Sequence, residues 1–165
     1  MAGPALADAL VGRGFSLDTR GLLAGHPGRY VMEVYPHAAH VRLFGLQERI
    51  AYKRKRGRTV AETRRGLTEL QRRLSRLLGA TVPGVLEDAE VRAALAPGAV
   101  EVRGRALKRL EDVLDGLTCA YAGWHVWRFG AGGTEVFGDQ ARGCICVPLG
   151  PAAVHATSAR ARTSP

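Results

Sequence analysis

The sequence predicts an α/β fold with few strands, several helices and a C-terminal β-hairpin. An apolar segment at 30–35 predicts a strand, and apolar residues at helical spacing predict helices at 59–78 and 107–123. With 165 residues, 46% of them hydrophobic and 24% charged, the chain has the composition of a single globular domain. We therefore expect one domain over 1–150, followed by a small, polar and disordered tail at 151–165.

Two short helices and a loop are expected in the first third of the chain. Pro4 favours a helix through 4–11, and the stretch 15–29, which is rich in Gly and Pro, is typical of a loop. A second short helix is expected within 38–50. Its candidate core positions are Val41, Phe44 and Leu46.

The run from Tyr30 to Tyr35 predicts a buried central strand. Its residues are apolar on both faces except for Glu33, and Pro36 ends the run. An edge strand with one outward-pointing side chain is the alternative for Glu33.

Helical patterns dominate the second half of the chain. Val60 and the leucines after it recur at helical spacing, so a long helix is expected from Thr59 to Gly79. A shorter helix is expected at 86–95. Near the end, two short β-rich runs predict a hairpin with strands at 134–137 and 143–147.

The helix expected at 107–123 carries two candidate site residues. Its apolar stripe consists of Leu107, Leu110, Leu114, Leu117 and Tyr121. Asp112 and Asp115 lie three residues apart on the neighbouring face. That face continues with the small residues Gly116, Cys119, Ala120 and Gly123.

Small residues allow a second backbone to pack closely, so this face is expected to be covered. Asp115 would then lie in largely apolar surroundings, where a carboxylate needs a partner or a metal ion. An ordinary solvated face is the alternative for both acids. Lys108 stands four residues before Asp112, and Arg109 could pair with either carboxylate.

The chain is strongly basic, with a formal net charge of +9 and a pI near 10.3. This charge favours a polyanionic partner, with nucleic acid as the first choice. The densest cationic run could neutralise several phosphates, and Tyr52 beside it could stack on a base. A solvated loop without a partner is the alternative. The run contains Lys53, Arg54, Lys55, Arg56 and Arg58.

Several classes of protein are disfavoured. Cys119, Cys144 and Cys146 neither form a disulfide framework nor match the spacing of a zinc site. The first residues lack the basic and apolar segments of a signal peptide, and no run approaches the length of a membrane span. We therefore expect a cytoplasmic protein without a membrane partner.

Glu33, Asp112 and Asp115 are the candidate catalytic and metal-binding residues. Phosphodiester hydrolysis by two metal ions requires a group of carboxylates, because hard oxygen ligands hold Mg²⁺ or Mn²⁺. The metal ions then activate water and stabilise the leaving oxygen. Acids on a rigid strand and on a facing helix could hold that geometry.

Four motifs occur in an order that resembles one protein family. They are Glu33-Val34-Tyr35-Pro36-His37, Tyr52-Lys53, the run from Leu114 to Tyr121, and the segment from Phe137 to Pro148. Together they resemble the domain of unknown function 429 family, predicted nucleases of the ribonuclease H-like fold. The resemblance extends from about Pro4 to Pro148.

The resemblance implies roles for individual residues. Glu33 and Asp115, and less directly Asp112, would bind Mg²⁺ or Mn²⁺. Lys53 and its arginine neighbours would hold the phosphate backbone. His37 could assist proton transfer, or serve only as a turn residue.

The chain departs from the family at its start. The family begins with a strand hairpin whose first strand carries an essential Asp. Here Asp8 falls in a predicted helix and Asp18 in a loop. We therefore expect the C-terminal portion of a ribonuclease H-like domain that lacks the N-terminal strands. The segment 30–35 would then expose unpaired backbone, so an oligomer or a complementing N-terminal fragment is expected as a partner.

Two functions follow from these expectations. The first is a metal-dependent nuclease, inactive if the first-strand Asp is missing. The alternative is a non-catalytic basic module for nucleic-acid binding or assembly. A degraded product with no function of its own is a third reading.

Overall fold

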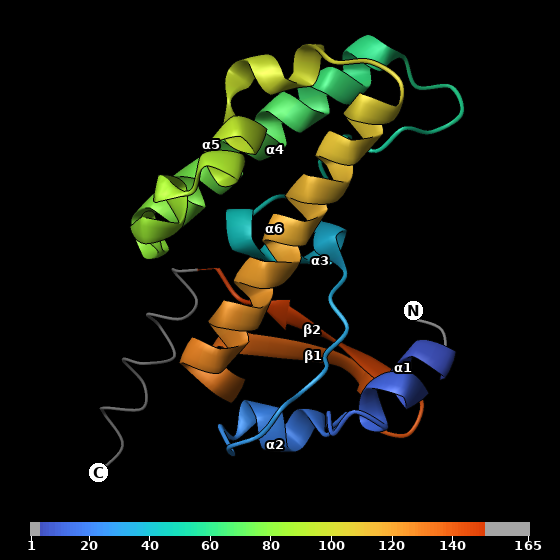
Figure 1. Cartoon of the computed structure of the whole chain (residues 1–165), viewed down its shortest axis with the longest axis vertical. Coiled ribbons are helices and arrows are strands. Elements are labelled where there is room, and N and C mark those ends of the chain that lie inside the picture. The colour runs from blue at the N-terminus through green and yellow to red at the C-terminus, as the bar shows by residue number, and fades with distance from the viewer. Residues whose placement is uncertain (1–3, 151–165) are drawn as a thin grey trace. The chain divides into compact units, whose positions relative to one another are not determined.

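The computed structural model of the chain describes residues 4–150 (Figure 1). These residues divide into two compact units. Unit 1 contains the described residues of 1–47 and 119–165, and unit 2 contains residues 48–118. The expected tail at 151–165 lies outside the described residues.

Helices and one antiparallel hairpin make up the described structure, which agrees with the predicted α/β class. Unit 1 contains α1 (Pro4–Val11), α2 (Thr19–Leu23), α3 (Pro36–Phe44), a 3-10 turn η3 (Gly130–Gly133), β1 (Thr134–Asp139) and β2 (Gly143–Pro148). Unit 2 contains α4 (Val60–Thr81), η1 (Pro83–Glu87), α5 (Ala89–Leu95) and η2 (Pro97–Glu101). The helix α6 (Arg105–Phe129) begins in unit 2 and continues into unit 1 at Cys119.

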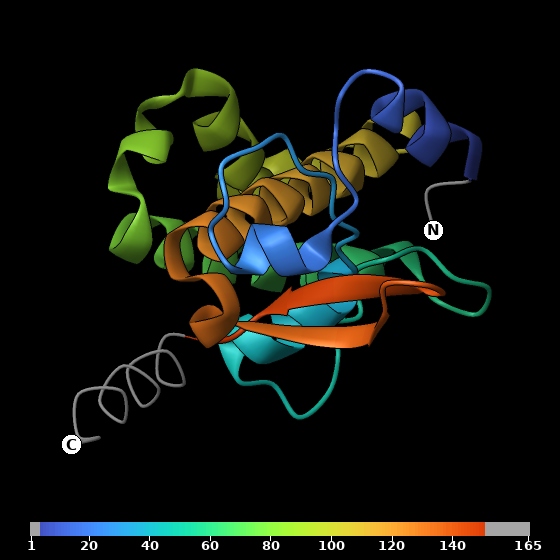
Figure 2. The ribbon, with the colours of Figure 1, turned by 90° about the horizontal axis from the view of Figure 1, so that it is seen from below.

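The C-terminal hairpin confirms the sequence prediction and extends it by two residues in β1 and one in β2. Thr134 pairs with Pro148 and Asp139 pairs with Gly143 (Figure 2). The Asp139 side chain closes the turn, since Oδ1 accepts hydrogen bonds from the amides of Ala141 and Arg142 at 2.9 and 2.8 Å. Gly143 has a φ of +101°, a conformation that a residue with a Cβ rarely adopts.

The prediction of a buried central strand at 30–35 is wrong. Only two isolated parallel bridges form there, between Ser16 and Tyr30 and between Glu33 and Ile145. Residues 30–34 are half-buried and Tyr35 is exposed. The segment meets each neighbour at a single residue, so no continuous ladder of hydrogen bonds forms.

The first helices differ from the prediction in their bounds. The stretch 15–29 contains the short helix α2, whose N-cap Asp18 accepts a hydrogen bond from the amide of Arg20 at 3.0 Å. The helix α3 begins at Pro36, two residues earlier than expected, because proline suits the first helical position. Its buried residues are therefore His37, Ala39, His40 and Leu43, while the expected Val41, Phe44 and Leu46 are half-buried.

The long helix α4 confirms the predicted start and corrects the predicted end. Thr59 and Glu62 form a reciprocal capping box at its first turn. The helix passes Gly79 and ends at Thr81, because Gly79 does not adopt the left-handed conformation that ends a helix. Val60, expected in the core, is 51% exposed at the first helical position. The buried side is formed by Thr63, Gly66, Leu67, Leu70, Gln71, Leu74, Leu77 and Leu78.

The helix α6 is longer than the predicted 107–123. Leu110, Leu114 and Tyr121 of the predicted stripe are buried, while Leu107 and Leu117 are half-buried. The expectation that a second backbone covers the small-residue face is wrong at Gly116. That residue is exposed, and no described atom of its unit lies within 4 Å of the position for a Cβ.

Candidate functional site

Asp115 of α6 is held by two side chains from the segment that precedes α4. Its Oδ1 accepts a hydrogen bond from the Tyr52 hydroxyl at 2.6 Å, and Lys53 Nζ lies 2.7 Å from Oδ2. The side chain of Asp115 is 17% exposed and that of Lys53 is 33% exposed. Both carboxylate oxygens are therefore engaged by neighbouring side chains of the same unit.

A close backbone crossing brings these partners to Asp115. The chain at Ala51 and Tyr52 passes over α4 at Gly66, where an added Cβ would lie 2.5 Å from the carbonyl oxygen of Ala51. Only glycine allows this approach. Tyr52 is completely buried beside α4 and its hydroxyl reaches Asp115. The side chain thus serves the interior of unit 2, and the expectation that Tyr52 could stack on a base is wrong.

Asp112 lies on a solvated helix face, which was the alternative to a role in a metal site. Its side chain is 61% exposed and its Oδ1 lies 2.6 Å from Lys108 Nζ, the expected pair at four residues' spacing. Lys108 also contacts Glu111 at 2.7 Å. The hydrogen bonds to Asp112 and Glu111 raise the pKa of Lys108 above its usual range, so this ammonium group stays charged.

Glu33 and His37 belong to unit 1. The backbone carbonyl of Glu33 accepts a hydrogen bond from the amide of Cys146 at 3.0 Å, and its side chain is half-buried. His37 is 9% exposed in α3, with its ring 5.7 Å from that of Tyr35. This position in the first turn of α3 makes a packed structural histidine the simpler reading.

Asp112 and Asp115 are each paired with a lysine and not grouped with each other. Among residues 4–150, no three His, Cys, Asp or Glu side chains gather in a way that could hold a metal ion. At Asp115 the Lys53 ammonium supplies the positive charge that a metal would otherwise supply. Cys119, Cys144 and Cys146 form no disulfide, and burial raises the pKa of Cys146 to about 11.

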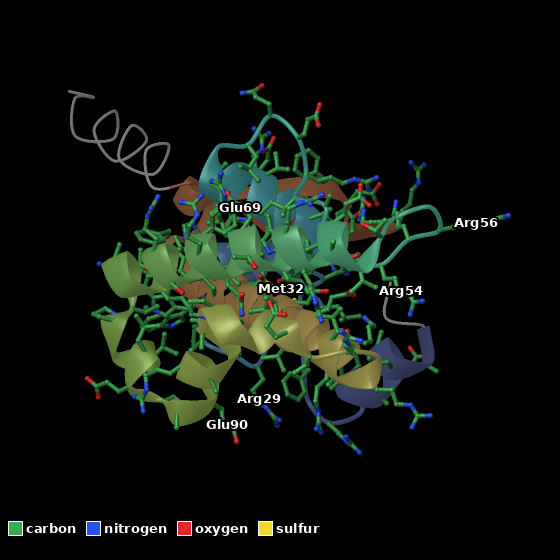
Figure 3. The ribbon with its side chains drawn as sticks, turned by 90° about the horizontal axis from the view of Figure 1, so that it is seen from above. Arg29, Met32, Arg54, Arg56, Glu69 and Glu90 are labelled. Carbon is green, nitrogen blue, oxygen red and sulfur yellow. The ribbon has the colours of Figure 1, made fainter. Side chains whose placement is uncertain are left out.

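The predicted cationic run forms a loop before α4, the basic loop (residues 53–58). Arg54, Lys55 and Arg56 are exposed, and Figure 3 shows Arg56 pointing away from the helices at the outer end of this loop. Arg58 instead donates a hydrogen bond to the carbonyl oxygen of Lys53 at 2.5 Å, which closes the loop. Three of the five predicted cations therefore face solvent. The other two, Lys53 and Arg58, contact Asp115 and the carbonyl oxygen of Lys53.

A pocket of about 620 Å³ beside the basic loop was not predicted from the sequence. Residues from two separated stretches of unit 2, 54–64 and 103–111, build it, so no local pattern could reveal it. Its charged lining residues are Arg54, Arg58, Arg64, Arg103, Lys108 and Glu111. Its other lining residues are Val60, Ala61, Thr63, Gly104 and Leu107.

A comparison with known protein families assigns the chain to one of them. The model of the family described as "Protein of unknown function (DUF429)" matches residues 3–142. The chain belongs to the DUF429 family. No curated protein and no solved structure matches it. None of the helices within residues 4–150 is both long and apolar enough to span a membrane.

Proposed function

We propose that this DUF429 protein binds nucleic acid through unit 2. The observation that carries the proposal is the exposure of Arg54, Lys55 and Arg56 together on the basic loop. Three neighbouring cations without a structural task can each neutralise a phosphate and release its counterions. The net charge of +9 supports the same partner, because it attracts a polyanion over a longer range.

Phosphate contacts of this kind predict binding that depends strongly on salt and weakly on sequence. Each lost contact should reduce the slope of log K against log[salt] by about 0.7 for a single strand and about 0.9 for a duplex. Lys55→Ala/Arg56→Ala removes two such contacts at the outer end of the loop. We expect it to weaken binding and to reduce the slope by about one to two units.

Fluorescence anisotropy with labelled single-stranded DNA, single-stranded RNA and duplex DNA tests this expectation over a range of KCl concentrations. The matched control is Arg20→Ala/Arg142→Ala, which removes the same charge from exposed positions of unit 1. Equal affinities and slopes for the two double variants would mean that net charge alone causes the binding. Wild-type protein that binds none of the three probes would overturn the proposal.

Metal-dependent phosphodiester hydrolysis is the second candidate, as part of a ribonuclease H-like nuclease. The observation that favours it is the largely buried carboxylate of Asp115, held at both oxygens. A carboxylate oxygen at such a position is a suitable ligand for Mg²⁺ or Mn²⁺. Loss of Mg²⁺- or Mn²⁺-dependent cleavage on Asp115→Asn is its test.

A further inference from the structure

The pocket beside the basic loop carries an excess of positive charge. Five cationic side chains line it, against the single carboxylate of Glu111. Lys108 lies 2.7 Å from that carboxylate, so this pair is internally balanced. The remaining four cations are arginines, whose planar guanidinium groups bind phosphate oxygens in pairs.

Two of these arginines have no partner in the described structure. Arg54 and Arg103 make no hydrogen bond and no ion pair with any of residues 4–150. One terminal nitrogen of Arg64 donates to the carbonyl oxygens of Glu101 and Val102 at 2.9 and 3.1 Å, and the other lies 3.4 Å from Glu101 Oε2. Its Nε is buried without an acceptor. The guanidinium groups of Arg54 and Arg103 are therefore the ones that can take an acceptor from a ligand in the pocket.

One helix N-terminus adds to this preference for an anion. The first turns of α4 and α6 reach the pocket through Val60, Ala61 and Leu107. The α6 helix has no acidic residue in its first turn, so its own sequence does not compensate its positive end. The N-terminus of α6 therefore adds positive potential to that of the arginines, whereas Glu62 already compensates the N-terminus of α4.

The pocket also has an apolar side. Val60, Ala61 and Leu107 line it between the arginines, and an inorganic anion would leave these side chains uncovered. A volume of about 620 Å³ lies within the range of roughly 300–1,000 Å³ that is typical of pockets for organic ligands. The lining therefore favours a molecule that is anionic at one end and apolar or aromatic at the other.

We propose that this pocket binds the phosphate monoester of a ring-bearing molecule, either a free nucleotide or the phosphorylated end of a nucleic-acid strand. The arginines hold the phosphate, and the flat ring covers Val60, Ala61 and Leu107. For a phosphorylated strand end, this proposal rests on nucleic-acid binding by unit 2 and names the group that is recognised. For a free nucleotide, the proposal does not depend on nucleic-acid binding.

Calorimetry with adenosine 5′-monophosphate, adenosine and inorganic phosphate tests the chemistry of the pocket. We expect the monophosphate to bind most tightly, because only it offers both a phosphate and a ring. Arg103→Ala removes an unpaired guanidinium group, and Ala61→Trp fills the pocket from an exposed position. Each variant should weaken binding of the monophosphate by about tenfold or more.

The matched controls are Arg105→Ala and Ala80→Trp, which change exposed residues outside the pocket, two residues after Arg103 and on the same helix as Ala61. Both should bind the monophosphate as the wild type does. If adenosine binds as tightly as the monophosphate, or if the pocket variants equal their controls, the proposal is wrong.

Oligonucleotides with a 5′-phosphate or a 5′-hydroxyl distinguish the two sources of the ligand. Tighter binding of the phosphorylated strand, lost in Arg103→Ala, identifies a strand end. Binding of the monophosphate without any preference between the strands identifies a free nucleotide. Strands that bind equally, together with no binding of the monophosphate, would overturn the pocket proposal and leave the basic-loop proposal standing. Binding of the monophosphate without binding of any strand would overturn the basic-loop proposal and leave the pocket proposal standing.

Discussion

At the scale of single residues, local pairs could be predicted and distant pairs could not. The spacing of Lys108 and Asp112 is enough to anticipate their ion pair, because four residues place two side chains on one helix face. Tyr52 and Asp115 are 63 positions apart, and nothing in either segment alone indicates that they meet. Their only sequence signal was that both belong to motifs shared with one family.

The hydrogen bond from Tyr52 to Asp115 should stabilise unit 2. Tyr52→Phe keeps the buried ring and removes only the donor to a largely buried carboxylate. We expect the free energy of unfolding to fall by about 1.5–3 kcal/mol, the usual range for a hydrogen bond to a charged group. Urea denaturation followed by circular dichroism measures this change.

The control for this prediction is Tyr35→Phe, because Tyr35 is exposed in unit 1. It should change stability by no more than about 0.5 kcal/mol. In an Asp115→Asn background the cost of Tyr52→Phe should shrink, since the charged acceptor is gone. A cost that is the same in both backgrounds would show that the hydroxyl does not act through Asp115.

At the scale of elements, a helix start that depends on local capping could be predicted from the sequence, whereas features that depend on tertiary contacts could not. Thr59 and Glu62 fix the start of α4 by local hydrogen bonds, so its first residue could be predicted. Gly79 looked like a helix end, yet the helix continues because that glycine keeps a helical conformation. The segment 30–35 has the composition of a buried strand, but strand formation depends on partners that the segment itself does not encode.

The backbone crossing at Gly66 gives a prediction about α4. Gly66→Ala should improve helix propensity, but the new Cβ would lie 2.5 Å from the carbonyl oxygen of Ala51. That atom belongs to the backbone, so it cannot simply rotate away. We expect a net loss of about 1–3 kcal/mol in the free energy of unfolding, typical of overpacking. Thermal or urea unfolding measures it.

Gly79→Ala provides a matched control on the same helix. Its new Cβ would meet only Leu86 Cδ1, at an ordinary 3.5 Å. This variant should therefore gain up to about 1 kcal/mol from helix propensity alone. The opposite signs are the test, and a stabilising Gly66→Ala would mean that the segment at Ala51 is free to move off the helix.

At the scale of the whole molecule, hydrophobic periodicity predicted the class of fold, and the net charge indicated the class of partner to test. The helices and the hairpin could be predicted because each has a local periodicity or a turn signature. The division into two units and the pocket of unit 2 could not, because both arise from contacts between stretches far apart in the sequence. The family match over residues 3–142 places the chain in a family without assigning an activity.

Whether the protein cleaves the strands that it binds is the remaining question at this scale. If it is a metal-dependent nuclease, Asp115→Asn should reduce the cleavage rate by about a hundredfold or more, because the loss of a catalytic carboxylate costs several kcal/mol of transition-state stabilisation. Asp112→Asn on the same helix should retain most of the rate, since Asp112 is exposed and paired with Lys108. Glu33→Gln tests the predicted ligand of unit 1 in the same way.

Cleavage of a labelled strand in Mg²⁺ or Mn²⁺, with anisotropy on the same samples, separates the two functions. Strand binding without cleavage in the wild type would favour the non-catalytic module, and equal rates for Asp115→Asn and wild type would remove Asp115 from the catalytic set.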